Sequence, residues 1–502
     1  MTAPLILPDD AYNRELVAHV HPPGRVNPTP AGRYQLVVLG GGTAGLVSAM
    51  GAAALGAKVA LVERHLLGGD CLNTGCVPSK ALIAAARAVA DARRLGAFGA
   101  RATVEVDFPA VMERLRRLRA EIAPHDGVER LTGAGVDVFL GDARFVSRDA
   151  VEVGGARLMF SRAVIATGAR AASLPVPGLA EAAAYTNETI FNLTELPTSL
   201  VVIGAGPIGC ELAQSFARLG STVTIVSLDD QVMPREDADA AAVVAVALVE
   251  DGVALRLGAK LLRVDRAGGT ATVVFERAGV EERVSAAGVL VAVGRAPNVE
   301  GLGLDVAGVA VDRAGVVVDD FLRTANPHIF AAGDVCSPLK FTHAADAMAR
   351  IVIQNALFPG RARVSRLVVP WCTYTEPEVA HVGLTEADAR KQGVPCLSLT
   401  LPLHDVDRAV LEGDTRGFAR LNVHPGTGRV LGATLVGRNA GDMIGPAVLA
   451  MTAGISASTL ARTIAPYPTQ GEIWKRLGDA WQRTRFTARV EAIVRLWLRW
   501  MR

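Results

Sequence analysis

The chain has 502 residues, which are too many for a single hydrophobic core and predict about three or four domains. Half of the residues are hydrophobic and a fifth are charged, so extensive disorder is excluded. Lys and Arg (52) nearly balance Asp and Glu (50), and the resulting net charge of +2 gives no reason to expect a nucleic-acid partner. Six cysteines are too few for a secreted disulfide framework.

The beginning of the sequence does not have the pattern of a targeting signal. Residues 1–10 (MTAPLILPDD) lack a positively charged start and contain too short an apolar run for a signal peptide. The uncharged stretch 35–57 has the length of a membrane span, but it begins as a strand followed by a glycine turn. We therefore expect a soluble, cytoplasmic protein in which residues 1–33 form a polar arm before the first core element.

A first dinucleotide-binding pattern follows this arm. The run 35–39 (QLVVL) predicts a buried strand, an Ala-rich helix comes next, and 58–62 (KVALV) predicts a second strand, which together make a βαβ unit. In such a unit one glycine makes the tight turn, one admits the pyrophosphate and one packs the helix, and these positions are Gly40, Gly42 and Gly45. Glu63 at the end of the second strand is placed to accept a hydrogen bond from a ribose hydroxyl.

The same pattern returns about 160 residues later and predicts a second nucleotide-binding unit. Strands at 200–203 and 222–226 flank a helix and the glycines Gly204, Gly206 and Gly209. The second strand ends at Ser227, which neither repels a 2′-phosphate nor anchors a 2′-hydroxyl strongly, although Asp229 or Asp230 could substitute for the missing acid. NADH and NADPH both stay open, with a slight preference for NADPH.

Two cysteines lie five residues apart in a glycine-bearing segment, at Cys71 and Cys76. They could close a small disulfide, and a helix beginning near Pro78 would favour a thiolate at its N-terminus. The alternatives are half of a zinc site or two buried thiols. A zinc site needs two more ligands, and no second Cys/His pair has suitable spacing, so redox chemistry is favoured.

The segment CLNTGCVPSK, placed just after the first glycine motif, closely resembles the flavin-dependent pyridine nucleotide–disulfide oxidoreductases, which include dihydrolipoamide dehydrogenase, glutathione reductase and mercuric reductase. The resemblance extends over nearly the whole chain from Tyr34 and includes ATG at 166–168, GRAPN at 294–298, AAGD at 331–334 and YTEPEVAHVG at 374–383. It implies an α/β fold with two Rossmann-like FAD/NAD(P)-binding domains and a C-terminal α+β dimerisation domain. The implied segments are the arm 1–33, FAD-binding 34–174, NAD(P)-binding 175–288, FAD-binding 289–366 and the interface domain 367–502.

The resemblance also implies an electron path from NAD(P)H through FAD to a Cys71–Cys76 disulfide. Cys76 would face the flavin as the thiolate, and Cys71 would be the exposed thiol that attacks the acceptor. Lys80 and Glu211 match an ion pair beside the flavin and the nicotinamide. Thr167, Gly168 and Gly294 belong to cofactor-binding motifs, and Asp334 would hold the ribityl chain.

The C-terminal motif departs from the pattern of thiol-reducing members. Those members carry His-Pro-Thr followed by Glu, and here Tyr467 takes the place of His while Glu472 is kept. A phenol titrates near pH 10, so it is a poor base for a dithiol at neutral pH. Mercuric reductase also has Tyr here, and a soft metal ion held by thiolates needs no proton shuttle.

The sequence therefore predicts a homodimeric, mercuric-reductase-like enzyme that reduces Hg(II) or another soft, thiol-reactive acceptor. It predicts no resident metal, only transient Hg(II) at Cys71 and Cys76, and the C-terminal Cys pair usual in mercuric reductase does not occur in RLWLRWMR. The alternatives are a disulfide reductase of the dihydrolipoamide dehydrogenase type, a quinone or small-molecule reductase that uses the flavin directly, and a membrane-associated electron-transfer partner.

The last residues, 490–502, have apolar side chains on one helical face and Arg on another. Such a helix can make weak contact with an anionic membrane, although it more often covers its own domain or a partner subunit. We expect the second arrangement.

Overall fold

The computed structural model describes residues 6–502, which form two compact units. The first unit comprises the described chain up to Asp230 together with Asp251–Leu367, and the second comprises Gln231–Glu250 and Val368–Arg502. Parallel sheets in the first unit and an antiparallel sheet in the second confirm the predicted fold class. Residues 1–5, which belong to the expected arm and to the segment that lacks the pattern of a signal peptide, lie outside the described residues. The division of the first unit into FAD- and NAD(P)-binding segments stays a prediction.

Seven strands form the largest sheet of the first unit: β1 (Arg33–Leu39), β2 (Val59–Glu63), β3 (Val136–Leu140), β4 (Ala143–Ser147), β5 (Ala150–Val153), β6 (Ala156–Ile165) and β18 (Ile329–Ala331). Their order is β3-β2-β1-β6-β5-β4, with β18 beside β6. Strands β1, β2, β3, β6 and β18 run parallel, with Val38 opposite Leu61 and Val164 in register. Buried on both faces, these strands are continuous apolar runs, as expected for a parallel sheet.

A second parallel sheet repeats the first on a smaller scale. It consists of β8 (Ser199–Ile203), β9 (Thr222–Val226), β10 (Ala254–Arg256) and β14 (Gly288–Val291), in the order β10-β9-β8-β14. An antiparallel sheet follows β10 in the chain and comprises β11 (Ala259–Ala267), β12 (Thr270–Arg277) and β13 (Val280–Ala286). Two short pairs complete the unit: β7 (Ala169–Ala171) with β15 (Arg295–Pro297), and β16 (Val311–Asp312) with β17 (Gly315–Val316).

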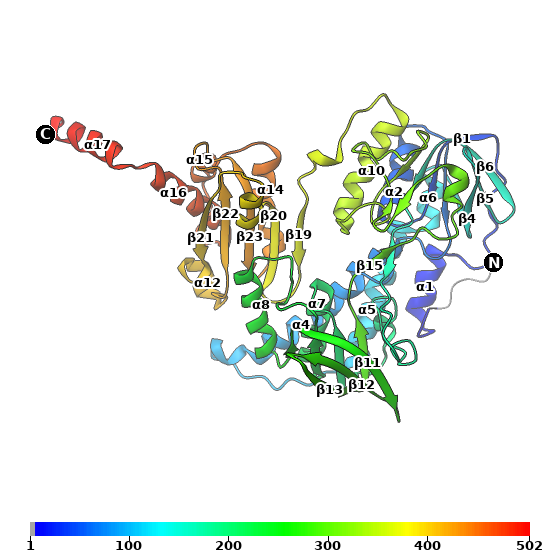
Figure 1. The fold of residues 1–502 in the computed structure, drawn as a ribbon, viewed down its shortest axis with the longest axis horizontal. Coiled ribbons are helices and arrows are strands. Elements are labelled where there is room, and N and C mark those ends of the chain that lie inside the picture. Colours follow the sequence, from blue (N-terminus) through cyan, green and yellow to red (C-terminus); the bar gives the residue numbers. More distant parts are fainter. Residues whose placement is uncertain (1–5) are drawn as a thin grey trace. The chain divides into compact units, whose positions relative to one another are not determined.

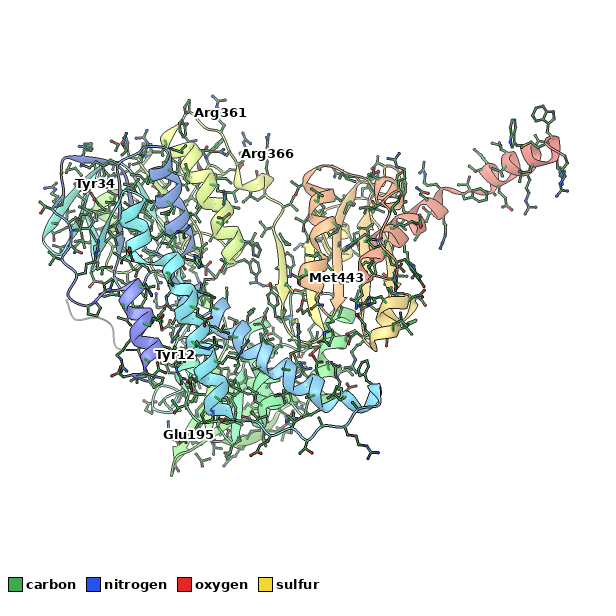
Figure 2. All side chains as sticks on the ribbon, turned by 180° about the vertical axis from the view of Figure 1, so that it is seen from behind. Tyr12, Tyr34, Glu195, Arg361, Arg366 and Met443 are labelled. Carbon is green, nitrogen blue, oxygen red and sulfur yellow. The ribbon has the colours of Figure 1, made fainter. Side chains whose placement is uncertain are left out.

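The helices of the first unit are α1 (Ala11–Val20), α2 (Thr43–Ala54), α3 (Gly69–Asn73), α4 (Cys76–Arg93), α5 (Phe108–Ile122), α6 (Val128–Gly133), α7 (Pro207–Leu219), α9 (Leu304–Ala307) and α10 (Thr342–Leu357). Helices α2 and α10 lie together against the large sheet (Figure 1), and both contribute to one hydrophobic core with β1. The segment expected to be a polar arm contains α1, whose Leu16 and Val20 are fully buried in the same core. Figure 2 shows α1, which carries Tyr12, beside α5.

The second unit is built on a five-stranded antiparallel sheet of β19 (Pro370–Thr373), β20 (Glu378–Gly383), β21 (Leu397–Pro402), β22 (Phe418–Val423) and β23 (Val430–Gly437). Its helices are α8 (Ala238–Glu250), α11 (Glu386–Lys391), α12 (Asp407–Glu412), α13 (Ala440–Met443), α14 (Gly445–Thr452), α15 (Ala457–Ala461), α16 (Ile473–Arg485) and α17 (Ala488–Trp500). Trp474, Leu477 and Trp481 of α16 pack on the sheet core. Across residues 6–502, no helix is both long and apolar enough to cross a membrane.

Candidate active site

The first glycine turn joins β1 to α2 at the carboxyl ends of the parallel strands, where ligands bind in open α/β sheets. Gly40 has φ +105°, a conformation that disfavours any side chain, and Gly42 is the N-cap of α2. A Cβ on Gly42 would meet only the Cα of Gly69, 3.7 Å away, so the backbone is accessible to a phosphate group. Glu63 fixes the turn, because its Oε2 accepts from the Gly41 N–H at 2.6 Å and its Oε1 accepts from the His65 N–H at 2.7 Å. Burial raises the pKa of the Glu63 carboxyl.

The second glycine turn has the same construction with a different anchor. Gly204 has φ +107°, and a Cβ on Gly206 would meet no atom within 4 Å, so the N-terminus of α7 is open. The Ser227 hydroxyl accepts from the Ala205 N–H at 3.3 Å, at the same sequence separation of 22 residues as Glu63 and Gly41. Ser227 in turn donates to Oδ2 of Asp229 at 3.3 Å. The carboxylate that the sequence lacks at position 227 is therefore supplied two residues later.

The cysteine pair lies where two helices meet rather than in an irregular turn. Cys71 is on α3, and Cys76 is the first residue of α4, two residues earlier than the start expected near Pro78. Both cysteines are free thiols in this structure. Cys76 is exposed and Cys71 is half-buried, and the assignment of Cys71 as the attacking thiol stays a prediction.

Electrostatics favours a thiolate at Cys76. A hydrogen bond from the Cys71 thiol, another from the Thr342 hydroxyl at 3.3 Å and the charge of Lys80 lower the pKa of Cys76 to about 6. The N-terminus of α4 adds its positive dipole end. Sharing the hydrogen bond raises the pKa of Cys71, which therefore stays protonated when Cys76 ionises. The pair is thus built so that Cys76 deprotonates first.

Two long-range contacts surround this pair. Lys80 on α4 donates to Oε2 of Glu211 on α7 at 3.0 Å, and the Glu211 carboxylate is buried, so the two residues expected to pair do so. Thr342 begins α10 and reaches Cys76 across 266 residues of sequence. No motif marked Thr342, because only the packing of α10 beside the large sheet brings it there.

Asp334 lies in a buried charged cluster that the sequence indicated only in part. The Arg295 guanidinium lies 3.5 Å from Oδ2 of Asp334 and forms an ion pair with Asp70, which directly precedes Cys71. Lys340 donates to the main-chain carbonyl of Asp334 at 2.8 Å. Burial raises the pKa of Asp334, and Arg295 opposes that shift. Arg295 was not expected in the site, although it lies inside the GRAPN motif.

The ATG and GRAPN motifs are held against each other. Thr167 donates from Oγ1 to the carbonyl of Asn298 at 2.7 Å, and the Asn298 amide donates back to the carbonyl of Thr167 at 2.9 Å. Gly168 has φ +68° and Gly294 has φ +119°, so both take left-handed conformations in the connection between β6, β7 and β15. These residues therefore brace the backbone beside the nucleotide turns.

Tyr467 and Glu472 lie in the second compact unit. The Tyr467 side chain is 72% exposed and donates to Oδ2 of Asp407 at 2.8 Å. Glu472 lies 3.4 Å from Arg476. The hydrogen bond to Asp407 raises the pKa of the Tyr467 phenol, which therefore remains protonated at neutral pH. It can donate a proton to a hydrogen bond but cannot serve as a base.

The residues present fit FAD at the first turn: an accessible helix N-terminus, a strand-end carboxylate and the half-buried Asp334, which is paired with Arg295. Within residues 6–502, no group of three or more His, Cys, Asp or Glu side chains is placed to hold a metal ion. Two dinucleotide turns and a polarised dithiol define the class of protein: a dinucleotide-dependent dithiol oxidoreductase.

Comparison with known proteins identifies the family of this oxidoreductase. The model of the pyridine nucleotide-disulphide oxidoreductase family matches residues 34–349, and its dimerisation domain matches residues 369–477. The chain therefore belongs to the pyridine nucleotide-disulphide oxidoreductase family, whose members are FAD-dependent and take electrons from NAD(P)H. It is accordingly an NAD(P)H-dependent flavoprotein oxidoreductase.

The individual relatives are of more than one kind. The chain is 36% identical over 441 residues to a mercuric reductase of Lysinibacillus sphaericus, covering 88% of this chain and 81% of the relative. It is 35% identical to a dihydrolipoyl dehydrogenase of Geobacillus stearothermophilus, covering 88% and 94%. Among solved structures, the Cu(II) complex of the HOCl-induced flavoprotein disulfide reductase RclA of Escherichia coli matches with a TM-score of 0.80 at 31% identity, covering 90% of this chain and 100% of RclA.

Proposed function

We propose that this enzyme reduces a soft, thiol-reactive metal ion, with Hg(II) as the first candidate. The observation that carries the proposal is the combination of the polarised Cys71–Cys76 dithiol with a phenol, Tyr467, in place of the base that thiol-reducing members use. The similarity to mercuric reductases and to RclA in its Cu(II) complex supports a metal acceptor. Cu(II) therefore belongs beside Hg(II) in the test.

The chain's own residues have separate tasks in this reaction. Bound FAD supplies two-electron transfer between NAD(P)H and the dithiol. Cys76, whose pKa is lowered to about 6, is a thiolate at neutral pH and a strong ligand for a soft cation. Cys71 becomes the second sulfur ligand when the cation displaces its proton to water. The balanced reaction is NAD(P)H + Hg(II) → NAD(P)⁺ + H⁺ + Hg(0). Because the cation displaces the Cys71 proton directly to water and the reduced metal takes up no proton, neither a general base nor a general acid is required.

The residues that we assign to the cofactors follow from the same geometry. Gly40, Gly42, Gly45 and Glu63, with Thr167, Gly168, Gly294 and Asp334, are assigned to FAD. Gly204, Gly206, Gly209 and Ser227 are assigned to the nicotinamide dinucleotide. The pair of Lys80 and Glu211 lies between α4 and α7 and is assigned to the boundary between the two sites. Tyr467 and Glu472 are assigned to the acceptor side, in a homodimer formed through the dimerisation domain and located in the cytoplasm.

For the nicotinamide dinucleotide, the geometry supports NADH over the NADPH that Ser227 alone suggested. The Ser227 hydroxyl is engaged by Ala205 and Asp229, and the Asp229 carboxylate sits at the strand end where dinucleotide folds recognise the ribose. A carboxylate there accepts from a 2′-hydroxyl and repels a 2′-phosphate.

A disulfide acceptor is the second candidate, favoured by the dihydrolipoyl dehydrogenases among the relatives.

The decisive experiment is NADH and NADPH oxidation by FAD-loaded protein with thiol-complexed Hg(II), Cu(II) and oxidised lipoamide in parallel. We expect turnover on the metal ions and little on lipoamide. Cys71→Ala should abolish turnover on the metal ions, and Cys396→Ala is the matched control. Metal turnover that survives Cys71→Ala would instead indicate direct use of the flavin, as in a quinone or small-molecule reductase, and efficient lipoamide turnover would overturn the metal proposal.

A further inference from the structure

The last helix of the chain exposes an unusual amount of apolar surface. Helix α17 is capped by the Thr487 hydroxyl, which accepts from the Val490 N–H, and none of its side chains is buried. Leu496 is 70% exposed and Trp500 is 76% exposed. Both figures show α17 continuing past α16 without packing on the sheet of its unit (Figures 1 and 2). It therefore does not cover its own domain, one of the two arrangements expected from the sequence, while contact with a partner subunit stays a prediction.

Three of the four Arg side chains of this helix are separated from its apolar side chains, and the fourth, Arg489, falls between Leu496 and Trp500. At about 100° per residue, the apolar residues occupy one arc of about 200°: Val490, Ile493, Val494, Leu496, Trp497, Leu498, Trp500 and Met501. The remaining arc carries Glu491 and the basic residues Arg495, Arg499 and Arg502. With Arg489 included, four Arg against one Glu give residues 488–502 a net charge of +3, whereas the whole chain has +2.

The positive charge of α17 distinguishes between two partners that could cover its apolar arc, a second copy of the helix and an anionic surface. The match to the dimerisation domain ends at residue 477, so α17 lies beyond it. Two copies of α17 packed through their apolar arcs would hold two helices of charge +3 side by side, which is repulsive although most of the Arg side chains face outward. An anionic surface removes this repulsion and accepts both the Arg side and the Trp and Leu side at its polar–apolar boundary. The helix has 13 residues, too few to span a bilayer that needs about 20, so it would lie along the surface.

We propose that α17 is an interfacial helix that binds the enzyme to an anionic phospholipid surface. Trp497 and Trp500, whose rings lie 5.1 Å apart, enter the boundary between headgroups and acyl chains. Arg495 and Arg499 meet the lipid phosphates. This proposal is independent of the acceptor, because α17 contributes no residue to the reaction described above.

The test is flotation of the FAD-loaded, full-length protein with vesicles of phosphatidylcholine alone or mixed with phosphatidylglycerol. We expect binding to the anionic vesicles only, weakened by high salt. The double variant Trp497→Ser/Trp500→Ser should lose binding, and Arg495→Gln/Arg499→Gln should weaken it about thirtyfold. Val280→Ser, which removes an apolar side chain 60% exposed on β13, is the matched control.

Two further readouts keep the outcomes distinct. NADH oxidation in solution should be the same in all these variants, since α17 lies outside the catalytic residues. The mass of the protein in solution, measured by light scattering, should also be unchanged. Equal binding to both vesicle types, or binding retained by the Trp double variant, overturns the proposal. A lower mass in the Trp double variant together with no vesicle binding would show that a second copy, not lipid, occupies the face.

Discussion

At the residue scale, the ionisation of Cys76 can be measured without any acceptor. The hydrogen bond from Cys71, together with Thr342 and Lys80, lowers the pKa of Cys76 to about 6, against about 8.5 for an ordinary thiol. A lowered pKa means that the reactive thiolate dominates above pH 6 and is lost only below it. We predict that alkylation of Cys76 by iodoacetamide, followed by peptide mass spectrometry on reduced protein, has its pH midpoint near 6.

The same experiment contains its own controls. Thr342→Val and Lys80→Met should each move the midpoint upward, because each removes a group that stabilises the thiolate. Burial raises the pKa of Cys336 to about 12, so this thiol should react slowly throughout. A midpoint for Cys76 near 8.5 would show that the two cysteines do not share a hydrogen bond in solution.

A second prediction at this scale concerns Asp229. Replacing it with Ser removes the carboxylate that Ser227 contacts and should raise kcat/KM with NADPH relative to NADH by at least about fivefold, the effect of about 1 kcal/mol between charges in water. Asp230→Ser is the matched control, since Asp230 has no such contact with Ser227 among the described residues. A ratio that responds equally to both variants would assign the preference to general charge rather than to Asp229.

At the scale of elements, α1 stabilises the segment that carries the cysteines. The Arg119 guanidinium of α5 is almost fully buried and donates to the carbonyl of Asn73, between the two cysteines, at 2.7 Å. It also donates to the Asn13 side chain of α1 at 2.6 Å. Burial lowers the pKa of Arg119 to about 10, so it is still charged at neutral pH and requires these acceptors.

We predict that Asn13→Ala loosens the cysteine segment from a distance. Leaving a buried charged donor without one acceptor costs about 1–3 kcal/mol, which should appear as faster hydrogen exchange of the amides at residues 71–76. Arg14→Ala, which removes only an exposed pair with Asp9, should leave the exchange unchanged. Unaltered exchange in Asn13→Ala would limit the role of α1 to packing.

Sequence patterns predicted the elements whose signal is local. Both βαβ units follow from apolar runs and glycines, with Glu63 as the last residue of β2 and Ser227 directly after β9. Helix α1 could not be predicted, because its buried residues Leu16 and Val20 form a short apolar pattern that becomes stable only against α5. Thr342, Arg295 and Arg119 were missed for a related reason, since each reaches the site through tertiary packing from a distant part of the chain.

At the scale of the whole molecule, the choice of acceptor is predicted to depend on one position in the second unit. In the proposed homodimer Tyr467 completes the partner's site, and a protonated phenol held by Asp407 cannot accept the proton that dithiol oxidation releases. Tyr467→His should therefore raise lipoamide turnover by about a hundredfold, the lower range of general-base catalysis, and leave Hg(II) turnover within a few-fold.

Tyr467→Phe separates this proton role from simple packing. The Phe variant loses the hydrogen bond to Asp407 but keeps the ring, so it should retain Hg(II) turnover and gain none on lipoamide. Glu472→Gln in the Tyr467→His background should cancel the gain, because the imidazole needs a carboxylate to orient it. If His brings no lipoamide activity while the protein stays dimeric and FAD-loaded, the specificity resides in the dithiol environment of the first unit, and position 467 is not its determinant.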